Sequence, residues 1–215
     1  MVKPLLRKIF PKRSRIFLWR LIPRIQRTNT YLLRNPQFFE TISSIDPKFE
    51  IRQIGLNDLE KLKKTYSDRG PEMFRNKIPP RLNSPDWVGL AVVDSSNGEI
   101  AYISWIVTKS IEYFKEFNID LEAGQFFLKD GYCSTYYRHQ GLHTRMEQER
   151  INYCIRNGAN EILIQILNAN EKGKASVLNN GYEFLQQNLI LSFPVLKIYR
   201  EINSVLKNPF KKIVK

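Results

Sequence analysis

The sequence contains only two cysteines, Cys133 and Cys154, among its 215 residues. So few thiols do not suggest the disulfide framework of a small secreted protein, and they favour a reducing, cytoplasmic environment. Histidine is equally scarce, with only His139 and His143. Because these four residues match no metal-site spacing, the sequence predicts no metal cofactor.

Long hydrophobic runs are also missing. The longest apolar run near the N-terminus is Ile16-Phe17-Leu18-Trp19, far below the roughly 20 residues that a membrane-spanning helix needs. Arginine and lysine interrupt this region every few positions, so no apolar core of a signal peptide is recognisable. The sequence therefore favours a cytoplasmic protein.

Acidic residues are missing from the first 39 positions, which carry ten Lys or Arg. Residues 197–215 carry six Lys or Arg and one acid, Glu201. Subtracting both ends from the totals of 34 bases and 21 acids leaves 18 bases and 20 acids for residues 40–196, a net charge of −2. The overall charge of +13 thus belongs to the ends. Nucleic-acid binding is therefore not expected as the main function.

The charge distribution predicts three regions: a basic amphipathic extension (1–47), a folded domain (48–194) and a basic C-terminal helix or tail (195–215). Large apolar residues accompany the bases of the first region, and its prolines limit a helix there to about three turns. Residues 1–27 therefore fit an anionic membrane surface, which would make the protein peripheral to the membrane. Packing of this segment on the domain and nucleic-acid binding are the alternatives.

Strand and helix signals alternate along the central region. Apolar β-rich runs predict strands, and amphipathic stretches with caps predict helices. The predicted helices begin near Leu59, Gly141 and residue 171. The predicted strands are Phe49–Ile54, Val88–Val93, Ile100–Val107, Gln125–Cys133, Glu161–Leu167 and Tyr182–Phe193. This order predicts a mixed α/β fold.

The segment Arg138-His139-Gln140-Gly141-Leu142-His143 lies between a predicted strand and a long helix. Backbone N–H groups at a helix start point at one place, and together with the helix dipole they bind phosphate oxygens. Gly141 lets the backbone approach a ligand closely because it has no side chain. The segment is therefore a candidate phosphate-binding loop.

This loop resembles the pyrophosphate loop of the GNAT acyltransferase superfamily, which reads Arg/Gln-x-x-Gly-x-Gly/Ala. Arg138 and Gly141 match the pattern, whereas His143 replaces its final small residue. In that family a strand, an Asn and a helix ending in Gly-Phe or Gly-Tyr follow. This chain has Asn170 and Gly181-Tyr182 at the corresponding interval.

The resemblance covers residues 49–193, more clearly in the second half. It implies a central, mostly antiparallel sheet with helices on both faces, which splays between the strands ending at Cys133 and Leu167. It also implies transfer of an acyl group from acyl-coenzyme A to an amine, with acetyl-coenzyme A or a longer-chain thioester as co-substrate.

The resemblance further implies where coenzyme A is bound. Its pantetheine arm would pair with backbone groups of Tyr132 and Cys133. Asn170 would contact the arm or fix the loop, and a helix N-cap is the compatible alternative. The pyrophosphate would be held by the loop and the first helical turn, that is by Arg138, His139, Gln140, Gly141, Leu142, His143 and Thr144.

Amine attack on a thioester requires the neutral amine, whose pKa in water is about 10, so a base or a water chain must take up a proton. Asp130, on the central strand, and His143 are the candidate bases. The alternative for Asp130 is a carboxylate that faces water at the strand end. The alternatives for His143 are a phosphate contact and a solvated histidine, and His139 is expected at the surface.

The family's acid for the departing thiolate is a Tyr seven residues after the Asn, where this sequence has Val177. Ser176 and Tyr182 are the neighbouring candidates for that role, and each is equally consistent with packing or capping. Cys133 has no His and carboxylate partners fixed by spacing, so a covalent cysteine mechanism has no support. Direct transfer is therefore expected.

Aromatic residues before and along the central strand are consistent with an acyl chain longer than acetyl, although strands are rich in aromatics anyway. The acceptor is expected to be a small-molecule or sugar amine. Fatty-acyl transfer to a Lys or ornithine side chain of a peptide is one alternative, and a non-catalytic coenzyme A-binding module is another. The aromatic residues before and along the central strand are Tyr113, Phe114, Phe117, Phe126, Phe127, Tyr136 and Tyr137, and the apolar Ile119 lies among them.

Overall fold

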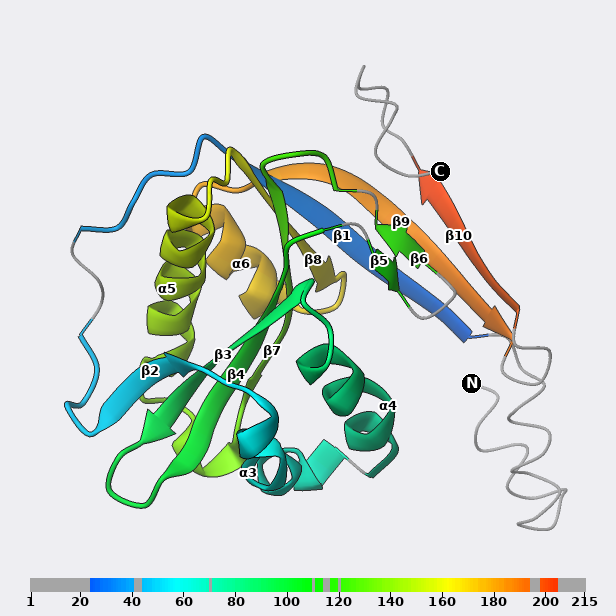
Figure 1. Cartoon of the computed structure of the whole chain (residues 1–215). Coiled ribbons are helices and arrows are strands. Elements are labelled where there is room, and N and C mark those ends of the chain that lie inside the picture. Colours follow the sequence, from blue (N-terminus) through cyan, green and yellow to red (C-terminus); the bar gives the residue numbers. More distant parts are fainter. Residues whose placement is uncertain are drawn as a thin grey trace, which may run out of the picture.

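The computed structural model describes residues 24–40, 44–69, 71–109, 111–113, 117–119, 121–193 and 198–204. An eight-stranded sheet with the order β10-β9-β1-β8-β7-β4-β3-β2 forms its centre (Figure 1). β7 (Gln125–Cys133) and β8 (Glu161–Leu167) run parallel, and the other neighbours are antiparallel. The predicted mixed, mostly antiparallel sheet is thus confirmed.

The remaining strands complete this sheet and a small hairpin. In the sheet are β1 (Arg24–Arg34), β2 (Phe49–Gln53), β3 (Trp87–Asp94), β4 (Glu99–Val107), β9 (Glu183–Phe193) and β10 (Ile198–Ser204). The separate hairpin pairs β5 (Ile111–Tyr113) with β6 (Phe117–Ile119).

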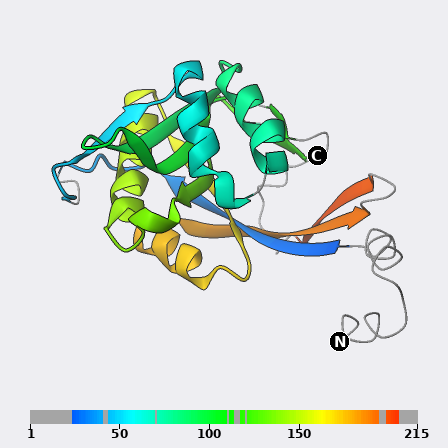
Figure 2. The ribbon, with the colours of Figure 1, turned by 90° about the horizontal axis from the view of Figure 1, so that it is seen from below.

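Helices cover both faces of the sheet, as predicted (Figure 2). α3 (Leu59–Thr65) and α4 (Pro71–Leu82) lie on one face, where their side chains pack around Trp105. α5 (Leu142–Arg156) and α6 (Glu171–Asn179) lie on the other, in a cluster with Tyr102. Three short 3₁₀ turns complete this part: η1 (Leu56–Asp58), η2 (Ser67–Arg69) and η3 (Thr135–Tyr137). β3 and β4 are almost wholly buried because both faces are covered.

β1 corrects the predicted boundary at residue 47 between a basic N-terminal extension and the folded domain. It pairs with β8 over Thr28–Arg34 and with β9 over Arg24–Leu32, so it is an inner strand. Its centre is uncharged and rich in β-formers, and Leu32 is only 2% exposed. The arginines that flank this strand made the segment look like part of the basic extension in the charge distribution. Its partners also lie more than 120 residues away, beyond any local pattern. Residues 1–23 lie outside the described residues.

β10 corrects the helix predicted for the C-terminal tail. Ile198–Ser204 pairs antiparallel with β9, from Ile198 opposite Phe193 to Ser204 opposite Gln187. The free edge of β9 supplies backbone hydrogen-bond partners, which outweigh local helix propensity. Residues 205–215 lie outside the described residues.

α4 and the β5–β6 hairpin were not predicted at all. α4 contains Pro79 and Pro80 in its last turn, where proline normally opposes helix formation. The hairpin carries Tyr113 and Phe117, which were considered for the acceptor site, whereas Phe114 lies outside the described residues. Their side chains lie outside the described part of the structure.

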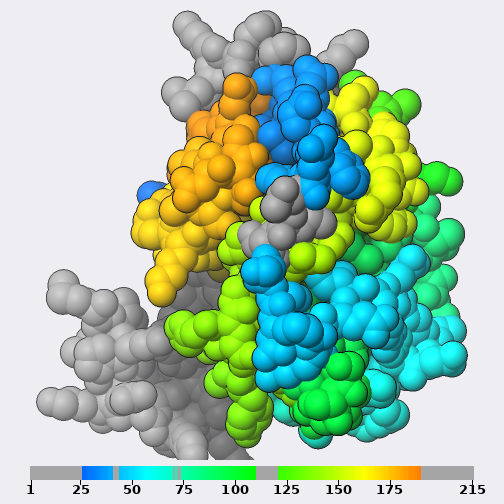
Figure 3. All heavy atoms as spheres, turned by 90° about the vertical axis from the view of Figure 1, so that its left-hand side faces the viewer, coloured from blue at the N-terminus to red at the C-terminus, as the bar shows by residue number. Residues whose placement is uncertain are grey.

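Residues 35–40 and 44–48, on either side of the undescribed residues 41–43, lie beside α5 (Figure 3). The backbone N–H of Phe39 donates to Asn152 Oδ1 at 2.8 Å, and Asn152 Nδ2 donates back to the Phe39 carbonyl at 3.1 Å. Ile45 packs on the same core cluster as α5. These contacts fix the helix whose N-terminus follows the candidate phosphate loop.

Candidate active site

The parallel pair of β7 and β8 is joined at one end and open at the other. Pairing runs from Gln125 opposite Glu161 to Leu128 opposite Ile164, and ends there, although both strands continue. A hydrogen bond from Lys129 Nζ to Gln165 Oε1 (3.0 Å) lies just beyond the last pair. The sheet therefore splays where the family resemblance implied.

A β-bulge in β7 accompanies the opening. Lys129 pairs with Trp105 and Tyr132 with Ile103, so two residues, Asp130 and Gly131, stand opposite one residue of β4. Asp130 has a φ of 46°, in the left-handed region that residues with side chains rarely adopt. Beyond the bulge, the Ser134 N–H donates to the Ala101 carbonyl at 2.9 Å. Because backbone groups alternate along a strand, the N–H of Cys133 faces away from β4, toward the gap.

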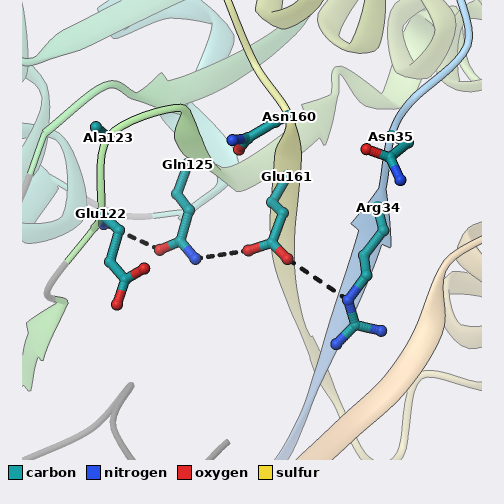
Figure 4. Close-up of a pocket in the computed structure, with 7 residues that line it drawn as sticks. All are labelled: Arg34, Asn35, Glu122, Ala123, Gln125, Asn160 and Glu161. Carbon is teal, nitrogen blue, oxygen red and sulfur yellow. Dashed lines mark hydrogen bonds and ion pairs between the residues drawn. The ribbon is translucent and has the colours of Figure 1, made fainter.

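The closed end of the pair is held by polar side chains (Figure 4). Gln125 Nε2 donates to Glu161 Oε2 at 2.6 Å, and Glu161 Oε1 lies 3.5 Å from Arg34 Nε. Arg34 also donates to Glu183 of β9 at 3.0 Å. These contacts link β7, β8, β1 and β9 around a polar cavity of about 300 Å³. The strands can therefore separate only at the opposite end.

A cavity of about 400 Å³ lies between β7 and β8 at their open end, and its lining comes from both faces of the sheet. α5 and α6, with the loop before α6, line it from one face, and Arg69 of η2 lines it from the face of α3 and α4. Leu128–Gly131 and Ile164–Leu167 form its walls. The lining from the α5 and α6 side consists of His143, Glu147, Arg150, Asn170, Lys172, Gly173 and Val177.

The candidate phosphate loop adopts the backbone that close approach of a ligand requires. His139 and Gly141 have φ values of 65° and 73°, and Gly141 is the N-cap of α5. The first N–H groups of a helix have no partner within it, so those of the first turn of α5 are available to an anion. The side chain of Leu142 is 2% exposed and anchors this turn in the core. The solvent-exposed residues are Arg138, His139, Gln140, Gly141, His143 and Thr144.

His143 joins three elements at the cavity. Its Nδ1 lies 2.8 Å from the hydroxyl of Tyr102 on β4, and its Nε2 lies 3.4 Å from Ser176 Oγ on α6. His143 is exposed as a whole residue, but the contacts of its ring with these side chains desolvate the imidazole, which lowers the pKa of His143 below its ordinary value and favours the neutral ring. Tyr102 is 2% exposed, and burial raises its pKa well above the ordinary value. The structure thus brings the predicted residues His143 and Ser176 together, and it adds Tyr102, which sequence reasoning missed.

The Tyr102 hydroxyl lies directly behind Gly131 of the cavity wall, in the space that a side chain at position 131 would fill. A Cβ atom at Gly131 would lie only 2.5 Å from that oxygen. The glycine and the tyrosine are 29 positions apart, so no local sequence pattern marks the pair. Val177, at the position of the family's Tyr, is buried and lines the same cavity.

Asp130 forms an ion pair instead of facing water. Its Oδ2 lies 2.5 Å from the Arg81 guanidinium, which is buried over the ring of Trp87 at 4.2 Å. Burial alone would raise the pKa of Asp130, but Arg81 and Lys129 lower it below the ordinary value. A carboxylate with a lowered pKa is a weaker base.

Two further predicted residues, Tyr132 and Cys133, do not line the cavity with their side chains. The Tyr132 hydroxyl bonds Asp68, and its ring lines a separate cavity beside α3. Burial raises the pKa of the Cys133 thiol, which suits an inert thiol more than a nucleophile. Only the backbone of these residues is placed for the predicted pairing.

Asn170 and Tyr182 occupy contrasting positions. Asn170 Oδ1 accepts from the Gly173 N–H at 3.0 Å as the N-cap of α6, and the residue also lines the cavity. Tyr182 is 3% exposed in the core, and burial raises its pKa well above the ordinary value. It does not line the cavity, so it stays only a sequence-based candidate for the acid.

A buried ion pair on α5 was also missed. Glu147 and Arg150 face the core, line the cavity and bond each other, and Arg150 donates to Ser104 Oγ at 2.6 Å. A Glu and an Arg three residues apart, one turn after His143, are the available signal. Such pairs usually lie on the solvent face of a helix.

No model of a protein family matches the chain, and no curated protein sequence matches it. Solved structures do match its fold. A tandem GNAT protein from the clavulanic acid biosynthesis pathway has a TM-score of 0.60 at 8% identity, covering 86% of this chain and 55% of that one. A GCN5-related N-acetyltransferase from Sphaerobacter thermophilus has a TM-score of 0.56 at 13% identity, covering 92% and 59%.

The chain thus spans 55% to 59% of the length of these two proteins. At such low identity the likeness concerns the arrangement of the backbone. It agrees with the mixed, mostly antiparallel sheet that the sequence resemblance had implied. The chain has the fold of the GNAT N-acyltransferases.

Proposed function

We propose that the protein is an N-acyltransferase that moves an acyl group directly from acyl-coenzyme A to an amine. The observation that supports this most is the cavity between β7 and β8, which passes through the sheet beside an exposed loop at the start of α5. A long thioester needs a site for its phosphates and a channel for its arm. The loop and the cavity offer both.

Coenzyme A fits this site as follows. The N–H groups of the loop and of the first turn of α5 hold the pyrophosphate. The pantetheine arm enters the gap, where the edge of β7 beyond Leu128 has backbone groups without a β8 partner. Asn170 and Lys172 add polar contacts from the α6 side.

In the reaction, the amine nitrogen forms a bond to the thioester carbon and the carbon–sulfur bond breaks, with its electron pair going to sulfur. The N–H of Cys133 is the donor proposed for the developing oxyanion. The proton lost by nitrogen goes to water, because Asp130 is engaged by Arg81.

Tyr102 supplies the hydroxyl that position 177 lacks. In the tautomer with a proton on Nδ1, His143 donates to the Tyr102 oxygen, which leaves the phenol proton available to a sulfur atom bound in the cavity beside Gly131. Because its pKa is raised, Tyr102 stabilises the thiolate by a hydrogen bond instead of giving up its proton.

The first test is calorimetric titration with acetyl-, octanoyl- and palmitoyl-coenzyme A, beside two matched variants. Gly141→Glu places an acidic side chain in the loop and should lose binding. Gly158→Glu is the control, because Gly158 also has a positive φ (86°) but lies at the far end of α5. Both variants carry the same charge and a similar backbone strain, so only the position differs.

Binding by the parent and the control, with at least a tenfold loss in Gly141→Glu, is the expected result. A preference for palmitoyl-coenzyme A would favour fatty-acyl transfer. Binding without turnover of any amine would favour a non-catalytic module. Absence of binding by the parent would contradict the acyltransferase proposal altogether.

A further inference from the structure

The amine must approach from the face of the sheet that carries α3 and α4. If the phosphates sit at the loop, coenzyme A enters from the α5 face, since that loop leads into α5. The cavity reaches the opposite face, where Arg69 lines it. The side chains around that opening therefore meet the acceptor.

Arg69 is an exposed cation at this opening. Its guanidinium lies 4.2 Å over the ring of Tyr132, and Tyr132 stacks on Tyr66 at 5.1 Å, which places all three on the α3 side. Among the described side chains, no carboxylate lies within ion-pair distance of Arg69. The neighbouring carboxylate of Asp68 instead accepts hydrogen bonds from Tyr132 and Thr135.

The charges nearest the opening are mainly positive. Lys129 belongs to the same face, because its ammonium group lies 4.8 Å over the ring of Phe127, which packs away from α5. Asp130 is the one acid among the cavity-lining residues of this face, and Arg81 neutralises it. Lys77 of α4 also contributes to the field that lowers the pKa of Asp130. Asp68, beside Arg69, is the other acid nearby in the described part of the chain, so the acceptor meets more cations than carboxylates.

We propose that the acceptor amine carries an anionic group, a carboxylate or a phosphate, which Arg69 binds on the α3 face of the cavity. This inference rests on the proposed function and names the class of its second substrate. A planar guanidinium binds either oxyanion through two parallel hydrogen bonds. An acceptor with further positive charges, such as a polyamine, is repelled by the same side chains.

The same charges favour the reactive form of the amine. Neighbouring cations lower the pKa of an alkylammonium group because they destabilise its charged form. A larger fraction of the bound amine is then neutral near pH 7, without a carboxylate base. The anionic group offsets the repulsion and holds the nitrogen at the opening.

Matched acceptors test this inference. With saturating acetyl-coenzyme A and purified full-length protein, the release of free thiol is followed for β-alanine against β-alaninamide and for O-phosphoethanolamine against ethanolamine. Spermidine represents the polycations. Rates are compared at equal concentrations of neutral amine. The two pairs separate a carboxylate acceptor from a phosphate acceptor.

The anionic member of at least one pair should have the higher kcat/KM, by about tenfold. Arg69→Gln should raise the KM for that member about tenfold, and leave its neutral partner and the affinity for acetyl-coenzyme A unchanged. Arg69→Lys should restore part of the loss. Arg156→Gln is the matched control, because Arg156 is also exposed near an aromatic ring, that of Phe38, at the far end of α5.

The outcomes separate this inference from the proposed function. Turnover confined to neutral amines or spermidine, or an Arg69→Gln variant that affects both members of a pair alike, would overturn the anionic acceptor alone. Failure of every amine, together with absent binding of acetyl-coenzyme A, would overturn the acyltransferase proposal first.

Discussion

At the scale of single residues, Tyr102 and His143 form the most specific arrangement around the cavity. A phenol on an inner strand meets an imidazole on a helix at 2.8 Å, across 41 positions of sequence. The small residue at 131 leaves room for the hydroxyl, while the bulkier His143 replaces the small residue that the family's loop normally has. The departures from the family pattern at 143 and 177 are thus compatible with one rearranged site.

Tyr102→Phe should lower kcat for acyl transfer about tenfold, which corresponds to the loss of one hydrogen bond to a charged sulfur. Its affinity for acetyl-coenzyme A should stay close to that of the parent. Steady-state kinetics and calorimetry measure the two quantities. Tyr137→Phe is the control, because the Tyr137 hydroxyl accepts from Asn97 at the β3–β4 turn instead of facing the cavity. Equal kcat for the parent and Tyr102→Phe would remove Tyr102 from the mechanism.

The lowered pKa of His143, the partner of Tyr102, determines the direction in which kcat depends on pH. Since burial depresses the pKa of His143 below 6.5, its neutral form persists at pH 6.5 and is lost only at lower pH. The acid limb of kcat that belongs to this residue should therefore have its midpoint below 6.5, and His143→Gln should lack it.

At the scale of elements, local patterns and distant pairings contribute differently to this fold. β7, β8 and the start of α5 lie where the sequence predicts them, because their apolar runs, Gly141 and the cap at Asn170 act within a few residues. β1 and β10 could not be predicted from local sequence, because their positions depend on pairing with β8 and β9. A basic, polar-flanked segment carries no local sign that it will enter a sheet.

The candidate site shows the same division. The loop residues, His143 and Asn170 are recognisable from spacing along the chain. Tyr102, Arg69 and the pair of Glu147 and Arg150 become site residues only when β4, η2 and α5 meet at the cavity. Their individual residue types are ordinary for a strand, a turn and a helix, so no motif marks them.

Because β1 is an inner strand, its core side chains should matter for the stability of the whole domain. Leu32→Ala should lower the free energy of unfolding by about 2–4 kcal/mol, since Leu32 is 2% exposed and packs with Val107, Phe127 and Leu163. Urea denaturation followed by circular dichroism measures the change. Leu178→Ala, at a 52% exposed position on α6, should change it by less than about 1 kcal/mol. Equal effects would show that β1 is dispensable for the core.

At the scale of the whole molecule, the positive charge is concentrated at the two ends of the chain, and the centre is nearly neutral. None of the helices in the described part of the chain combines the length and apolar character that crossing a membrane requires. Residues 1–23 hold seven Lys or Arg, no acid, and large apolar residues such as Phe17 and Trp19. They precede β1, so removing them retains every strand that the structure describes.

We therefore expect a peripheral interaction with anionic lipid that depends on residues 1–23. The full chain should sediment with vesicles containing phosphatidylserine and not with purely zwitterionic ones, since each base near such a surface contributes about 1 kcal/mol. Deletion of residues 1–23 should abolish sedimentation and preserve the affinity for acetyl-coenzyme A.

A variant with these seven bases replaced by Gln, but its apolar residues kept, separates the contribution of charge from that of apolar insertion. If it still sediments, apolar insertion is the main contribution. If the full chain does not sediment with vesicles but binds DNA with a steep salt dependence, the segment binds nucleic acid instead of lipid.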